Sequence, residues 1–299
     1  MKVCFTNNFN NIFTDLLPAI KQKGWKVPMD YMDADKVVLW NEVEPDAIMI
    51  INLLHKLKKK AITLQHGRYG TSKYYPPFNQ QIISDKLCVW GTRDRNALLE
   101  AGHPADKVEV VGTTIFNHLK YREDHEGTNV VFCPEHWGGE IEENRLVAEE
   151  LRKLKNVNII TKILQGEHKP EWYDNTVTSN RRGIGHLDIC ADVLAKADLI
   201  VSIAEGTFEL MAQYLNIPVV LMEEWKFKPF KEDKRFLSYR RMYSEASKKA
   251  KMSNLCEVIE QQLENPDELK EERALVVREE GGTDVPNPIE KILNIIKCA

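Results

Sequence analysis

Residues 199–220 read LIVSIAEGTFELMAQYLNIPVV, and this stretch decides the fold class. Its apolar start runs without polar alternation to Ser202, which indicates a strand covered on both faces. A turn of small residues follows, and apolar residues at helical spacing predict a helix over 207–215. A second strand is expected over 218–222. A strand, a helix and a strand in this order build a parallel sheet.

The same alternation of apolar runs and helix-period segments extends along the chain in both directions. Strands are predicted over residues 2–6, 46–51, 61–64, 87–90, 108–111, 129–133, 157–163, 199–203 and 218–222. Helices are predicted over residues 11–23, 53–60, 92–101, 140–155, 186–196, 207–215, 254–263, 265–278 and 289–298. The sequence therefore predicts an α/β protein built on parallel sheets.

The alternation lapses between residues 112 and 129, where the charged stretch 120–127 contains few apolar residues. Such a break is typical of a domain linker. We expect a Rossmann-like domain over 1–120, a second over 128–285, and a C-terminal helix over 286–299 that crosses back to the first domain. The two doubly wound domains are expected to face each other across a cleft, with the site at the carboxyl ends of their strands.

Composition excludes several classes of function. The 299 residues include 41 basic and 45 acidic side chains, and the net charge of −4 gives no reason to expect nucleic acid as a partner. The longest apolar run, 47–51, is far too short for a membrane span. Six cysteines lie far apart without a CxxC pair, which favours free thiols in a reducing cytosol and predicts a cytoplasmic protein.

Common cofactor and metal motifs are absent from the sequence. No G-x-G-x-x-G follows the first predicted strand, and no P-loop appears, which argues against a simple nicotinamide dehydrogenase or a P-loop kinase. No paired CxxC motifs, H-E-x-x-H or G-x-S-x-G occur either. We therefore expect neither a resident cofactor nor a resident metal.

The turn after Ser202 has the residue types of a nucleotide site. Backbone amides of Gly206 and Thr207 at the helix start suit a diphosphate, because the positive end of the helix dipole lies there. Glu209 is expected off the apolar stripe, at the rim of the site, where its carboxylate suits the vicinal hydroxyls of a ribose. A simpler interpretation is that Glu209 complements the dipole and that Ser202 or Thr207 caps the helix.

This segment resembles the donor-nucleotide segment of GT-B glycosyltransferases. It is especially similar to the branch that contains the CDP-glycerol glycerophosphotransferases and the UDP-N-acetylglucosamine 2-epimerases. Other stretches resemble this branch in the same order along the chain. They are Gln65-His66-Gly67, Val89-Trp90-Gly91, the run 101–112, Cys133-Pro134-Glu135-His136-Trp137, Ile160-Thr161-Lys162-Ile163 and the tail from Gly281-Gly282 to Ile292.

The resemblance implies a role for further residues. His66 would take a proton from an acceptor hydroxyl, with Gly67 and Arg68 on the acceptor side. His136 and Lys162 would face the nucleotide phosphates, and the loop at Ile184 would contact the nucleobase. Hydrogen bonding of His66 to a nearby backbone group, and plain surface positions for His136 and Lys162, are the simpler alternatives.

The implied function is a metal-independent transfer of a sugar or polyol-phosphate from a nucleotide-activated donor to a hydroxyl acceptor, such as a glycan or polyol-phosphate. A UDP-sugar 2-epimerase would need carboxylates in the strand-end loops. The matching places in this sequence are Ile51-Asn52-Leu53 and residues 65–69, which hold no carboxylate. A non-catalytic nucleotide-binding protein is the third hypothesis. The basic, aromatic segment 225–231 suits a polyanionic acceptor, although such a stretch is more often a solvated loop that shields a domain edge.

Overall fold

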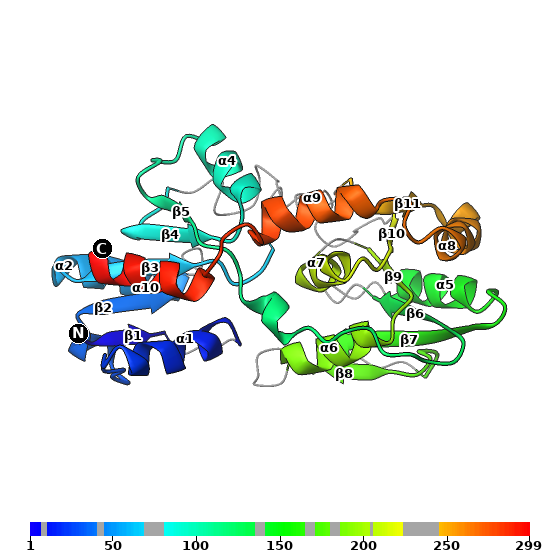
Figure 1. Ribbon diagram of the computed structural model, residues 1–299, viewed down its shortest axis with the longest axis horizontal. Coiled ribbons are helices and arrows are strands. Elements are labelled where there is room, and N and C mark those ends of the chain that lie inside the picture. Colours follow the sequence, from blue (N-terminus) through cyan, green and yellow to red (C-terminus); the bar gives the residue numbers. More distant parts are fainter. Residues whose placement is uncertain are drawn as a thin grey trace. The chain divides into compact units, whose positions relative to one another are not determined.

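Two separate parallel sheets organise the chain (Figure 1). The computed structural model describes residues 1–6, 11–40, 45–68, 81–134, 141–164, 171–179, 186–203, 206–223 and 245–299. Met1–Ile115 together with Arg278–Ala299 forms unit 1, and Phe116–Val277 forms unit 2. The chain thus passes between the units after Ile115 and again after Val277, whereas the sequence analysis placed these divisions at 120–128 and after 285.

Unit 1 contains a five-stranded parallel sheet in the order β1-β2-β3-β4-β5. Its strands are β1 (Val3–Phe5), β2 (Lys36–Leu39), β3 (Lys60–Leu64), β4 (Lys86–Val89) and β5 (Val108–Val110). Its helices are α1 (Asn11–Gln22), α2 (Pro45–Lys56), α4 (Thr92–Glu100), α10 (Pro288–Cys298) and the 3-10 turn η1 (Tyr31–Asp33), with η2 (Ile115–His118) at the division.

A single bridge at Lys26 makes this sheet doubly wound. The N–H of Val3 donates to the Lys26 carbonyl (2.9 Å), whereas the carbonyl of Lys2 accepts from Lys36 (3.2 Å). Because neighbouring residues of a strand point their backbone groups to opposite edges, Lys26 lies beside β1 on the edge away from β2. After β1 the chain first passes Lys26 on one edge of β1 and then forms β2 on the other edge. The direction of winding therefore reverses between β1 and β2.

Helices cover both faces of the unit 1 sheet. Val3 and Phe5 face one core with α1 and α10, which lie side by side in Figure 1. Cys4 lies between them in the sequence and faces the opposite core with α2. Successive side chains of a strand point to opposite faces of the sheet. A strand whose sheet is covered on both faces therefore has apolar residues at every position. The C-terminal helix α10 is thus part of the core of unit 1.

One predicted strand is wrong. Residues 46–51 lie in the first half of α2 rather than in a strand. Ala47, Ile51 and Leu54 are buried at helical spacing, while Met49 is 62% exposed. A run of five apolar residues reads equally as a buried strand or a helix face, and length alone could not separate them. The strand that fills this place in the sheet is β2, which the sequence analysis missed.

Unit 2 contains a six-stranded parallel sheet in the order β11-β10-β9-β6-β7-β8. Its strands are β6 (Thr128–Cys133), β7 (Val157–Leu164), β8 (Val177–Ser179), β9 (Leu199–Ser202), β10 (Val219–Met222) and β11 (Lys248–Ala250). Its helices are α5 (Ile141–Leu151), α6 (His186–Ala195), α7 (Thr207–Tyr214), α8 (Leu255–Glu264), most of α9 (Lys270–Gly281) and the 3-10 turn η4 (Met252–Asn254).

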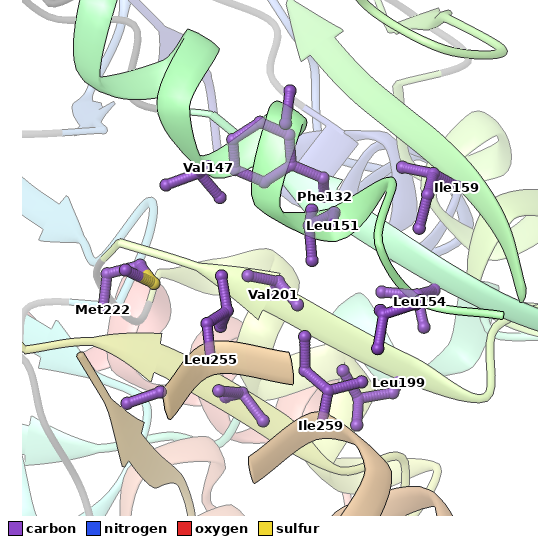
Figure 2. Close-up of a cluster of buried hydrophobic side chains, with 14 of the residues drawn as sticks. Phe132, Val147, Leu151, Leu154, Ile159, Leu199, Val201, Met222, Leu255 and Ile259 are labelled. Carbon is purple, nitrogen blue, oxygen red and sulfur yellow. The ribbon is translucent and has the colours of Figure 1, made fainter. Parts of the chain in front are cut away.

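The strands of unit 2 switch direction of winding between β6 and β9. From β6 the chain moves outward through β7 to β8, and then returns to the other side of β6 at β9. Phe132 and Val201 pack with Leu151 of α5 and Ile259 of α8 on one face (Figure 2). On the other face, α7 contacts β9, β10 and α6. Among the described residues, no helix is long and apolar enough to cross a membrane.

The end of α9 meets the strand ends of unit 1 through glycines. Gly282 has φ +63°, and a Cβ placed there would lie 2.0 Å from the Trp90 carbonyl oxygen. A Cβ on Gly91 would lie 1.8 Å from the carbonyl oxygen of Glu279. Only glycine permits backbones to approach this closely. The glycines fix where the chain re-enters unit 1.

We expect Gly282→Ala to lower the free energy of unfolding of unit 1 by roughly 2–4 kcal/mol, because it combines a positive φ with overpacking. Gly24→Ala is the matched control, since Gly24 has φ +71° with no atom within 4 Å of its added Cβ. It should cost only about 1 kcal/mol. Urea denaturation of both variants measures the difference, and equal losses would contradict the close backbone approach.

Candidate functional site

The candidate site in unit 2 lies where the strand order switches. Cys133 at the end of β6 is the register partner of Ser202 at the end of β9. Ser202 is buried, and Cys133 is half-buried. In open parallel sheets, ligands bind outside the carboxyl ends of the strands at such a switch point. Ser202 ends a buried strand, as the sequence predicted, and the helix that follows has Gly206 as its N-cap.

Lys162 and the first turn of α7 come together at this edge. The half-buried Lys162 projects from β7, the neighbour of β6, and its Nζ lies 4.6 Å from the centroid of the Phe208 ring. Burial raises the pKa of the Cys190 thiol on α6, while the charges of Lys162 and Glu209 act on it in opposite directions. The cation of Lys162 and the carboxylate of Glu209, which come from distant segments, thus both lie near Cys190.

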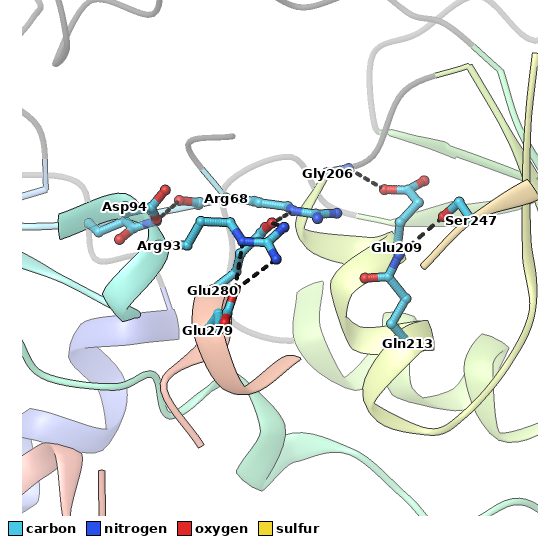
Figure 3. Close-up of polar contacts among 11 residues, drawn as sticks. Arg68, Arg93, Asp94, Gly206, Glu209, Gln213, Ser247, Glu279 and Glu280 are labelled. Atoms are coloured by element: carbon cyan, nitrogen blue, oxygen red, sulfur yellow. Dashed lines mark hydrogen bonds and ion pairs between the residues drawn. The ribbon is translucent and has the colours of Figure 1, made fainter. Parts of the chain in front are cut away.

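Glu209 is buried, and it caps its own helix. The residue is only 5% exposed, and its Oε2 accepts a hydrogen bond from the Gly206 N–H at 2.7 Å (Figure 3). This is the reciprocal half of a capping box, in which the third helical residue reaches back to the N-cap. The expectation of Glu209 at an exposed rim is wrong, and the N-cap is Gly206 rather than Ser202 or Thr207.

This cap changes what the helix start offers a ligand. The Gly206 amide, expected to point at a diphosphate, already donates to Glu209. Amides of the first turn such as that of Phe208 have no partner within the helix, and the positive end of the dipole remains there. A carboxylate has about four lone-pair sites, so Glu209 retains capacity to accept from a ligand hydroxyl.

In unit 1, His66 lies at the carboxyl end of β3 beside the end of β2. Its Nδ1 is 2.9 Å from the Trp40 carbonyl oxygen, and the two rings meet edge to face at 4.7 Å. A carbonyl only accepts, so Nδ1 carries the proton and Nε2 of the neutral ring has the lone pair. The simpler interpretation of His66, a hydrogen bond to a backbone group, is therefore present in the structure. The same bond leaves the ring in the tautomer that a general base needs.

The two residues after His66 differ in their surroundings. Gly67 is half-buried, and its carbonyl accepts from Gln65 Nε2 at 2.9 Å. Arg68 is buried, and its Nε donates to the carboxylate of Glu280 near the end of α9 (Figure 3). Arg93 pairs with Glu280 and Glu279 in the same cluster. Arg68 therefore makes an internal contact in unit 1, and its role toward an acceptor remains a prediction.

Sequence reasoning missed Gln65, Asp94 and Glu280 as parts of this site. Gln65 Nε2 donates to Asp94 Oδ2 at 2.7 Å, and both side chains are buried. Position next to His66 was the only signal for Gln65. Glu280 precedes the Gly281-Gly282 turn, but Asp94 looked like an ordinary first-turn acid of α4.

Two predicted site residues, His136 and Ile184, lie outside the described residues, as does the basic segment 225–231. Within the described part of the chain, no group of three or more histidine, cysteine, aspartate and glutamate side chains is placed to hold a metal ion.

The stability role of Glu209 gives a direct prediction. Glu209→Ala leaves the Gly206 amide without its acceptor, so the free energy of unfolding should fall by about 1–2 kcal/mol. Glu209→Gln keeps an acceptor oxygen and should lose less. Glu257 is an exposed first-turn acid of α8, and Glu257→Ala should cost under about 1 kcal/mol. Chemical denaturation measures these losses in the free energy of unfolding. Equal losses for Glu209→Ala and Glu257→Ala would contradict the capping role of Glu209.

Asp94 predicts a pH dependence of stability. Burial, with the nearby Glu280 charge, raises its pKa to about 7 from an ordinary 3.8. Between these values the folded chain holds a proton that the unfolded chain has lost, so stability falls as pH rises from about 4 to 7. The full effect is about 4 kcal/mol. Asp94→Asn should remove this fall, and denaturation midpoints measured from pH 4.5 to 8 test it.

Solved structures share this architecture across nearly the whole chain. MnaA of S. aureus, in a co-structure with UDP, has a TM-score of 0.66 at 11% identity, with 99% of this chain and 95% of that chain covered. The wall teichoic acid polymerase TagF has a TM-score of 0.62 at 11% identity, with 99% and 88% covered. The UDP-GlcNAc 2-epimerase from Neisseria meningitidis, bound to UDP-GlcNAc, has a TM-score of 0.59 at 13% identity, with 97% and 81% covered.

No protein-family model matches the sequence, and a search of curated proteins finds no match. At identities this low, structural likeness shows the fold alone. The two doubly wound parallel sheets predicted from the sequence are confirmed, and the chain has the GT-B fold shared by glycosyltransferases and UDP-sugar 2-epimerases.

Proposed function

We propose that the protein is a GT-B-type transferase that moves a sugar, or a polyol-phosphate, from a nucleotide-activated donor to a hydroxyl acceptor. The observation that carries this proposal is the meeting of Lys162, the start of α7 and Glu209 at the strand switch of unit 2. A cation and a helix start suit a diphosphate, and a neighbouring carboxylate suits sugar hydroxyls. These three features make unit 2 the donor side.

The donor contacts follow from charge and geometry. Lys162 Nζ offsets the negative charge that collects on the leaving phosphate, with first-turn amides of α7 as further donors. Glu209 keeps its bond to Gly206 and accepts from a ribose hydroxyl with its remaining lone pairs. MnaA was solved with UDP and the Neisseria enzyme with UDP-GlcNAc, so uridine nucleotides are the first donors to test.

His66 is the base of the proposed reaction. The acceptor oxygen forms a bond to the anomeric carbon of a sugar donor, or to phosphorus of a polyol-phosphate donor. The bond to the leaving nucleotide breaks, and a nucleoside diphosphate or monophosphate departs with the electron pair. The acceptor proton passes to Nε2 of His66, whose Nδ1–H is held by the Trp40 carbonyl.

A UDP-sugar 2-epimerase is the second candidate, because one argument against it does not hold. The sequence predicts a strand-end loop without carboxylates at residues 51–53, but these residues lie inside α2. The segment that follows β2 continues in the sequence through Glu42 and Glu44, which lie outside the described residues. The transferase is preferred because the described loop after β3 offers a histidine in the tautomer of a base.

Lys162→Met should weaken UDP binding by about 10–100-fold, because one charge-assisted contact to phosphate is lost. Lys153→Met is the charge-matched control, since Lys153 is exposed and pairs with Glu150 on the same unit. Its UDP affinity should equal that of the wild type. Isothermal titration calorimetry measures all three, and similar affinity in Lys162→Met would remove Lys162 from the site.

His66→Ala should lower the turnover number by about 10²–10⁴-fold while the donor dissociation constant changes less than a few-fold. The assay offers UDP-, CDP- and GDP-activated donors with a panel of hydroxyl acceptors and follows nucleotide release with product formation. Inversion at C2 of an intact nucleotide-sugar would establish the epimerase instead. Tight nucleotide binding without turnover on any donor would favour a binding protein.

A further inference from the structure

The side chain of Gln65 holds the turn that carries His66. One Nε2 hydrogen goes to the Gly67 carbonyl (2.9 Å) and the other to Asp94 Oδ2 (2.7 Å). Its Oε1 accepts from the Trp90 backbone N–H at 2.7 Å. Rotating the amide by half a turn would set Oε1 against two acceptors, so its orientation is unique. The bond from Gln65 Nε2 to the Gly67 carbonyl spans His66, the proposed base, which lies between these two residues.

The backbone of Gln65 is fixed as well. Its N–H donates to the Cys88 carbonyl at 2.9 Å, and its own carbonyl accepts from the Trp90 indole Nε1 at 3.0 Å. Gln65 is 1% exposed. A buried amide with every bond made is rigid, and each bond lost leaves a buried polar group unsatisfied.

Asp94 orients this amide from the first turn of α4. It is 1% exposed, and its carboxylate receives the Gln65 Nε2 hydrogen. The other charged groups that act on Asp94 are Arg68, Arg93 and Glu280. These belong to a cluster that also fixes Arg68, so residues 65 and 68 are buried anchors on either side of the half-buried His66 and Gly67.

We propose that Gln65 and Asp94 are positioning residues that set the orientation of the His66 imidazole. They hold the turn so that Nδ1 meets the Trp40 carbonyl and Nε2 keeps the lone pair. The inference rests on the proposed function, in which His66 is the base. A misplacement of about 1 Å costs on the order of 10²-fold in rate, which is the scale expected on losing either residue.

The first test reads the ring without turnover. Proton–nitrogen correlation spectra of the imidazole side chains distinguish the Nδ1–H tautomer, and His66→Gln assigns the signal of His66. Gln65→Leu and Asp94→Ala should shift His66 away from the Nδ1–H form. Asp94→Asn still offers an oxygen to Gln65 Nε2 and should keep the wild-type signal. An unchanged His66 signal in folded Gln65→Leu and Asp94→Ala would overturn the proposal.

Leu98→Ala is the control for lost stability, because Leu98 is a buried apolar residue on the same helix as Asp94. It should leave the His66 signal unchanged, and a shift equal to that of Asp94→Ala would make the effect a general loosening and overturn the proposal. Should Gln65→Leu fail to fold, the comparison of Asp94→Ala with Asp94→Asn carries the same decision.

The second test is kinetic. Gln65→Leu and Asp94→Ala should lower the turnover number about 10²-fold with KM and UDP affinity unchanged, and Asp94→Asn should restore most of the rate. A shifted tautomer with a wild-type turnover number would overturn the positioning role. If the wild-type protein transfers from no donor while the tautomer still responds, the proposed function fails and the orienting contact stands.

Discussion

The candidate donor site depends on one constraint of parallel sheets. Every strand of unit 2 ends at the same edge, and the reversal of winding between β6 and β9 leaves a place there that no crossover helix covers. Cys133 and Ser202 become neighbours because β6 and β9 pair in register. Lys162 arrives from β7, which pairs with β6 on its other side, and α7 must begin where β9 ends. Ser202, Lys162 and the start of α7 lie close together because β9, β6 and β7 are neighbouring parallel strands that end at the same edge of the sheet.

Helix α7 connects this site to the two places where the chain leaves and enters unit 2. Its first turn holds Glu209. At its other end, Tyr214 stacks on Phe116 at 4.3 Å, directly after the first division. Asn216, in the left-handed conformation that ends the helix, accepts from the buried Arg273 of α9 at 2.8 Å. An eight-residue helix is stiff on this scale, so contacts at the candidate site and contacts with both connecting segments fix its position together.

Much of the fold could be predicted from the sequence, because the periodicity of long apolar segments distinguishes strands from helices. The exceptions were short or ambiguous. Strand β2 has four residues, and the apolar face of α2 resembles a strand. Of the candidate site, Ser202 at its strand end and the start of α7 could be placed from the apolar pattern, whereas Lys162 was suggested only by the resemblance of residues 160–163 to known relatives. The burial of Glu209 could not be predicted, because α7 packs against segments such as α6 and β10 that the local pattern does not reveal. The hydrogen bond between Gln65 and Asp94 joins residues 29 positions apart, so the local pattern does not reveal it either.

The charges around Asp94 explain why a buried carboxyl is tolerated beside the proposed base. Arg68 and Arg93 carry two positive charges, while Glu279, Glu280 and Asp94 together would carry three negative ones. Protonation of Asp94 balances these charges. Burial is the main reason that its pKa is raised to about 7, and the Glu280 charge adds to the effect. A protonated carboxyl keeps an oxygen that accepts from Gln65, so the amide keeps its orientation in both states. The contact that holds the His66 turn therefore does not require the charge that burial makes costly.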